Sequence, residues 1–161
     1  MDDLFARGEA VGALLKARRE TVAVAESSAG GLVSASLLAV PGASAYFLGG
    51  AVVYTATARE QLLGIAAAEM AGMRSSSEPY AMLLARTLRT RFGTVWGIAE
   101  TGASGPGGNR YGDAAGHSCL AISGPVEVVV TLETGHGDRA ANMREFTLAL
   151  LDLFEKTLAG R

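Results

Sequence analysis

Residues 21–34 constrain the fold of this chain more than any other segment. The apolar run 21–25 is typical of a buried strand, and the pair Gly30 and Gly31 precedes a helical pattern that begins at Leu32. A strand that turns tightly into a helix is the building unit of α/β proteins.

The glycine pair has two interpretations. Glycines at such a turn let backbone N–H groups approach a ligand, and the helix N-terminus adds partial positive charge, so the turn suits an anion or a carbonyl group. Alternatively, Gly30 and Gly31 only permit close packing of the helix on the strand. The pair alone favours the second interpretation, because the sequence matches neither the dinucleotide-binding fingerprint nor the P-loop.

Composition limits the class of protein. The 161 residues are 49% hydrophobic, which predicts one domain over residues 1–161 with a sizeable core. The net charge of −2 argues against nucleic acid or a membrane surface as partner. We also expect a small-molecule ligand and a homo-oligomer. Cys119 is the only cysteine and lies in an apolar run, which predicts a buried strand residue and a reducing, cytoplasmic location. No apolar run is long enough to predict a membrane span.

Hydrophobic periodicity predicts alternating helices and strands. Helices are expected at 2–19, 32–40, 57–63, 80–92 and 138–158, and strands at 21–25, 48–54, 94–99, 117–122 and 126–132. The last two strands are close enough to form an antiparallel hairpin. The order predicts an α/β fold, a three-layer α/β/α sandwich with a mixed, largely parallel sheet.

Two polar loops follow predicted strands, at 26–31 and 101–108, and both are rich in small residues. Ligands of such sheets bind where strands end, so we expect these loops to meet at one cleft.

Four segments in the same order carry a resemblance: Ala-Glu-Ser-Ser-Ala-Gly-Gly at 25–31, Val-Pro-Gly-Ala-Ser-Ala-Tyr-Phe at 40–47, Gly-Ala-Val-Val-Tyr at 50–54 and Thr-Gly-Ala-Ser-Gly-Pro-Gly-Gly at 101–108. Together they resemble the CinA C-terminal domain family, the nicotinamide-nucleotide amidases. The resemblance implies a three-layer α/β/α domain that hydrolyses nicotinamide mononucleotide to nicotinate mononucleotide and ammonia. It also implies a serine hydrolase with a Ser/Lys pair that uses no metal or cofactor.

The resemblance also assigns roles to residues of this sequence. Ser44 would be the nucleophile, Tyr54 would assist proton movement or hold the carboxamide, and Thr101 would lie beside the reacting group. Arg139 suits the substrate phosphate. Other residues expected to bind substrate are Ser27, Gly30, Gly31, Arg59, Glu100, Gly102 and Gly105. Each of the four main residues has a purely structural alternative, as a turn cap, a core-edge residue, a loop cap or a solvated charge.

Two residues depart from the family pattern. Arg59 stands where the family's amidases have lysine, and arginine, with a pKa above about 12, cannot serve as a base. Glu100 stands at the end of a buried strand where an apolar residue is usual. We expect Glu100 to form a salt bridge with Arg59 or Arg74, the alternative being a base with a raised pKa.

Two classes of function therefore stay open. The first is an amidohydrolase of the nicotinamide-nucleotide amidase type, with absent or strongly reduced activity because Arg59 replaces the base. The second is a non-catalytic paralogue that binds a nucleotide-like ligand or a protein. A dinucleotide-dependent oxidoreductase is excluded because its glycine fingerprint is absent.

Overall fold

The computed structural model describes residues 1–161 and contains five helices and five strands. The helices are α1 (Asp2–Arg18), α2 (Leu32–Leu38), α3 (Ala56–Leu63), α4 (Glu78–Phe92) and α5 (Arg139–Ala159). The strands are β1 (Val22–Glu26), β2 (Phe47–Val52), β3 (Trp96–Ala103), β4 (His117–Ser123) and β5 (Val128–Glu133). Two short 3₁₀ turns, η1 (Ala43–Ala45) and η2 (Ala67–Met70), complete the elements.

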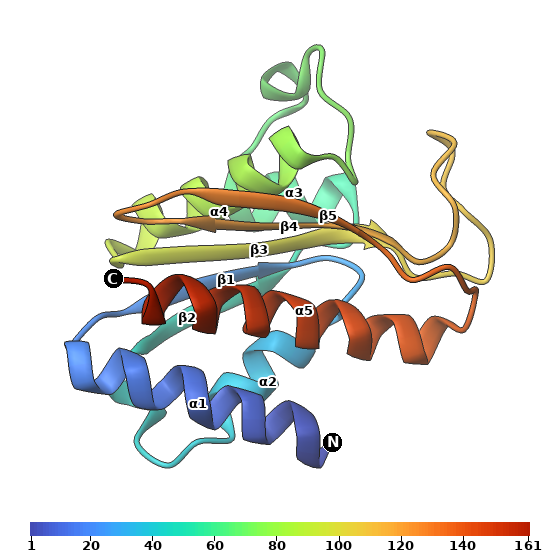
Figure 1. The fold of residues 1–161 in the computed structure, drawn as a ribbon. Coiled ribbons are helices and arrows are strands. Elements are labelled where there is room, and N and C mark those ends of the chain that lie inside the picture. Colours follow the sequence, from blue (N-terminus) through green and yellow to red (C-terminus); the bar gives the residue numbers. More distant parts are fainter.

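The strands form one sheet in the order β2-β1-β3-β4-β5. β1 runs parallel to both β2 and β3, whereas β4 is antiparallel to β3 and to β5. The predicted hairpin of the last two strands is thus confirmed. Helices α1, α2 and α5 cover one face of the sheet, and α3 and α4 lie on the other (Figure 1). The predicted α/β/α sandwich with a mixed sheet is confirmed.

Each face of the sheet has its own hydrophobic core. On the α5 face, Trp96 and Phe154 are fully buried and meet edge to face, with ring centroids 5.5 Å apart. On the α4 face, Leu84 and Leu88 pack with the small β-strand residues of the other core cluster. A fully buried side chain of this size stabilises the fold by about 1.5–3 kcal/mol, so the two cores fix the helices against the sheet.

Local sequence signals set the ends of the helices that lead to the loops. The hydroxyl of Thr55 accepts a hydrogen bond from the N–H of Ala58 at the start of α3, and Ser77 does the same for Tyr80 at the start of α4. Gly93 ends α4 with a positive φ of 64°. The helices expected at 57–63 and 80–92 therefore begin slightly earlier than predicted, at Ala56 and Glu78, and their predicted ends at Leu63 and Phe92 are confirmed. No helix of the structure combines the length and apolarity that crossing a bilayer requires.

One strand is longer than predicted. β3 continues to Ala103 instead of ending at Ala99, because its last residues pair with the start of β4. Thr101 and Gly102 therefore lie inside a strand, and the irregular loop begins after them.

Candidate functional site

The turn after β1 is organised by the buried carboxylate of Glu26. One oxygen of Glu26 accepts from the N–H groups of Gly31 (3.1 Å) and Val33 (2.8 Å), and the other accepts from the N–H and hydroxyl of Ser34 (2.9 and 2.6 Å). The start of α2 is thus already occupied by an anion of the chain itself.

This arrangement corrects the expectation that Gly30 and Gly31 line a ligand pocket. Both residues have a positive φ, 67° and 98°, which the tight turn requires. A Cβ atom on Gly30 would lie 2.9 Å from Cε of Met143. Neither glycine lines a cavity, and their role is the turn and close packing.

A second buried carboxylate, Glu100, lies beside this turn. It accepts from the N–H groups of Ser27 (3.1 Å) and Ala29 (2.7 Å), from the hydroxyl of Ser118 (3.1 Å) and from the hydroxyl of Ser28. Burial raises the pKa of Glu100, and the hydrogen bonds from Ser28, Ala29 and Ser27 oppose that rise.

The predicted salt bridge from Glu100 to an arginine is wrong. Four donors from the turn and β4 take the place of a cation, and no arginine is within ion-pair distance of Glu100. Glu100 is fully buried and lines neither cavity of the site, so the alternative role as a base has no access to a ligand.

The main cavity has a volume of about 580 Å³ and opens where β1 and β3 end, beside α3 and the start of α4. The side chains of its polar lining residues carry hydroxyl or guanidinium groups: Ser27, Tyr54, Thr55, Ser75, Ser76, Tyr80, Thr101, Tyr111, Arg59, Arg74 and Arg110. No lysine, histidine, aspartate or glutamate lines it. The cavity therefore offers donors and positive charge but no ordinary base.

A second cavity of about 310 Å³ adjoins the first, and Tyr54 and Gly102 line both. It is lined by Ser28, by Arg139 and by the glycine-rich loop that follows β3 (residues 104–108). Arg139 donates to the carbonyl of Gly105 (2.6 Å) and to the hydroxyl of Tyr54 (3.0 Å). The predicted meeting of the turn after β1 with the glycine-rich loop is confirmed.

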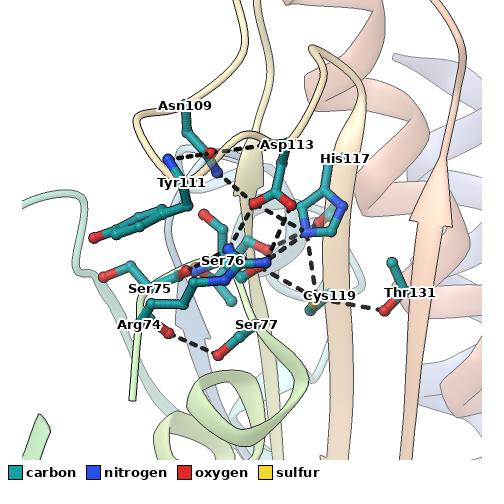
Figure 2. A network of polar contacts seen from close by, with 12 residues as sticks. Arg74, Ser75, Ser76, Ser77, Asn109, Tyr111, Asp113, His117, Cys119 and Thr131 are labelled. Carbon is teal, nitrogen blue, oxygen red and sulfur yellow. Dashed lines mark hydrogen bonds and ion pairs between the residues drawn. The ribbon is translucent and has the colours of Figure 1, made fainter. Parts of the chain in front are cut away.

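One wall of the main cavity is held by an ion pair, drawn in Figure 2. Arg74 donates to both carboxylate oxygens of Asp113, at 2.6 and 3.1 Å, and Asn109 donates to the same carboxylate at 2.7 Å. Burial alone would raise the pKa of Asp113, but Arg74 and Asn109 outweigh it and the pKa is lowered. Arg74 is thus satisfied within the chain and ties residues 74–76 to the loop before β4.

His117 contacts the same segment and lies next to Asp113 and Ser76 (Figure 2). Its Nδ1 lies 2.5 Å from a carboxylate oxygen of Glu133, and its Nε2 lies 2.9 Å from the carbonyl oxygen of Ser76. The N–H of Ser76 donates to the hydroxyl of Thr101 at 3.3 Å. Burial lowers the pKa of His117, but Glu133, Ser76 and Asp113 raise it more, so the pKa is raised. Sequence reasoning missed this residue, whose only signal was a histidine opening a buried strand.

Arg59 is the unusual charge of the main cavity. Arg59 is a residue of α3 and is 9% exposed. Its Nε has no hydrogen-bond partner, and the ion pairs made by arginines use other residues, namely Arg7, Arg74, Arg86, Arg144 and Arg161.

Comparison with known proteins decides the family. The sequence model of the CinA C-terminal domain matches residues 6–158. The chain belongs to the CinA C-terminal domain family. A CinA-like protein of Anaeromyxobacter sp. (strain K) is 39% identical over 150 residues, 93% of this chain and 37% of that protein. A CinA-like protein of Synechococcus sp. (strain CC9902) is 45% identical over 69% of this chain and 26% of its own length. The chain thus spans well under half the length of these curated relatives.

Solved structures support the fold of this CinA C-terminal domain. A CinA superfamily protein from Klebsiella pneumoniae 700603 superposes with a TM-score of 0.91, covering 98% of this chain and 99% of its own, at 24% identity. The competence/damage inducible protein CihA from Agrobacterium tumefaciens gives a TM-score of 0.88 at 23% identity, covering 98% of this chain and 96% of its own.

Within this CinA C-terminal domain, Ser44 does not lie where the resemblance predicted. It is exposed in η1, before β2, and lines neither cavity. Because β2 runs parallel to β1 and ends beside Glu26, Ser44 lies at the other end of the sheet, about 20 Å of strand away. The expectation that Ser44 lies beside Thr101 is wrong. Tyr54 and Thr101 do line the main cavity, and Ser27 supplies a serine hydroxyl beside them.

Proposed function

We propose that this chain is a nucleotide-binding protein of the nicotinamide-nucleotide amidase type that hydrolyses nicotinamide mononucleotide only slowly. The observation that carries the proposal is the lining of the main cavity, which combines hydroxyl groups and arginines with no group that can accept a proton at neutral pH. Family membership supports a nucleotide ligand. The absence of a proton acceptor among the lining residues is the reason to expect slow hydrolysis.

The binding half of the proposal depends on Arg139 and the glycine-rich loop. Arg139 reaches over this loop from the start of α5, where its guanidinium can meet a phosphate without opposing carboxylates among the lining residues. The remainder of a mononucleotide would then pass Tyr54, which lines both cavities, and place its ring in the main cavity.

The catalytic half depends on Ser27. Ser27 lines the cavity together with Thr101, and attack on a carboxamide carbon would come from its hydroxyl. A serine hydroxyl needs a proton acceptor to attack an amide. Arg59 is a permanent cation, and burial raises the pKa of the Tyr80 phenol, so neither accepts that proton. Loss of general-base help slows such a reaction by about 10² to 10⁴.

Calorimetric titration with nicotinamide mononucleotide, followed by measurement of ammonia release, tests both halves. We expect saturable binding with slow release, and we expect Ser27→Ala to abolish the release while binding persists. Absence of binding would refute the proposal. Fast release that survives Ser27→Ala but is lost on Ser44→Ala would restore Ser44 as the nucleophile.

A further inference from the structure

Arg59 is a buried cation that the chain itself leaves without a counter-ion. The residue is 9% exposed, its Nε has no partner, and no carboxylate lies within ion-pair distance. Buried charges are otherwise paired, because an unpaired one costs several kcal/mol of desolvation. A guanidinium cannot escape this cost by losing its proton. An anion from outside the chain that pairs with Arg59 would offset this desolvation cost.

The other cations of the main cavity do not need such an anion. Arg74 is bound by both oxygens of Asp113, and its guanidinium lies 5.3 Å from the centroid of the Tyr111 ring. Arg110 is exposed and stacks on the same ring at 5.1 Å. The unmet positive charge of the cavity is therefore concentrated on Arg59.

The groups around Arg59 favour a carboxylate. Ser27, Thr101 and Tyr80 line the same cavity, and their hydroxyls can donate to a group that only accepts. A planar guanidinium binds a carboxylate with two parallel hydrogen bonds. A carboxamide would instead turn a donor N–H₂ group toward a surface already rich in donors.

Arg59 and Arg139 belong to different but adjoining cavities. Arg139 lines the smaller one with the glycine-rich loop, and Tyr54 lines both. We infer that the joined cavities select a nucleotide with two separate anionic groups, a carboxylate at Arg59 and a phosphate at Arg139. Resting on the proposed function, this makes the acid nicotinate mononucleotide the preferred ligand over the amide nicotinamide mononucleotide.

Titration of the full chain with both nucleotides tests the inference. We expect nicotinate mononucleotide to bind about 10-fold to 100-fold more tightly than nicotinamide mononucleotide, as a hydrogen-bonded charge pair implies. Arg59→Gln should remove this preference and leave affinity for the amide nearly unchanged. Arg86→Gln, which removes the same charge from the exposed side of α4 outside both cavities, should keep the preference.

The outcomes separate this inference from the proposed function. Equal binding of the two nucleotides, or a preference for the amide, overturns the carboxylate site while the proposed function stands. A preference that survives Arg59→Gln also overturns it. If neither nucleotide binds, the proposed function itself fails. Free nicotinate and inorganic phosphate, titrated separately, should each bind more weakly than the nucleotide, and Arg59→Gln should affect only nicotinate.

Discussion

Two neighbouring regions of the molecule differ in whether their buried ionisable side chains have partners within the chain. At the turn after β1, Glu26 of β1 and Glu100 of β3 are fully buried, and hydrogen bonds from within the chain reach all four of their oxygens. In the main cavity, Arg59 is nearly as buried and lacks a carboxylate. The first region is therefore a completed structural unit. We infer that the second is completed by a ligand that supplies the missing negative charge.

The largest effect is expected where the charge is satisfied internally. Glu100→Gln keeps the shape of the side chain but places an N–H₂ group where one carboxylate oxygen accepts from the hydroxyls of Ser28 and Ser118, because the other oxygen is needed by the N–H groups of Ser27 and Ala29. We expect a loss of about 2 to 4 kcal/mol in the free energy of unfolding, measured in urea. Glu60→Gln, on the exposed side of α3, should change it by less than about 0.5 kcal/mol. Similar values for the two variants would contradict the description of the turn.

The opposite sign is expected at Arg59. Arg59→Met removes an unpaired buried cation and keeps most of the apolar contact, so the ligand-free protein should gain about 1 to 2 kcal/mol. Arg19→Met, at an exposed position after α1, should be nearly neutral. A destabilisation by Arg59→Met as large as that of Glu100→Gln would show that Arg59 has a structural partner and would remove the contrast between the regions.

A smaller effect is expected at His117, which contacts the wall of the main cavity. The pKa of His117 is raised, so its contribution to stability is present below its unfolded value of about 6.5 and is lost as pH rises above it. The groups facing it are Glu133, Asp113, the thiol of Cys119 and the carbonyl of Ser76. We expect a loss below about 1 kcal/mol, since Glu133 is exposed to solvent.

Urea unfolding at pH 6 and at pH 8 measures this loss, with His117→Gln as the control that should not show it. Glu133→Gln should reduce the loss, because it removes the carboxylate nearest to Nδ1. A stability that rises over this pH range in the unmodified chain but not in His117→Gln would reverse the assignment.

Most of the fold could be predicted from the sequence because its signals are local. Caps at Thr55, Ser77 and Asp138 each accept the hydrogen bond that begins a helix. Apolar periodicity predicts every helix and strand with ends that lie within a few residues of those in the structure. Cys119 is 1% exposed on β4, as its apolar neighbours predicted. The end of β3 was misplaced because its last pairs are long-range contacts with β4.

The candidate site could be predicted only in part. The wrong predictions concern residues whose neighbours are far away in the sequence and are brought close only by the fold. Ser44 precedes a strand and Thr101 ends one, and in parallel strands these positions lie at opposite ends of the sheet. The motif around Ser44 does not by itself indicate at which end of the sheet this serine lies. The partners of Glu100 are mainly backbone N–H groups and serine hydroxyls, which no charge pattern in the sequence reveals.

We infer that Arg59 provides binding charge where an amidase needs a base, and the variant Arg59→Lys tests this role most directly. A lysine in this cavity can lose its proton, because burial lowers the pKa of an ammonium group. With nicotinamide mononucleotide as substrate, we predict that Arg59→Lys raises the rate of ammonia release by about 10² or more, and that adding Ser27→Ala abolishes the gain. Arg86→Lys should leave the rate unchanged. Fast release by the unmodified chain, with no gain on Arg59→Lys, would contradict the account.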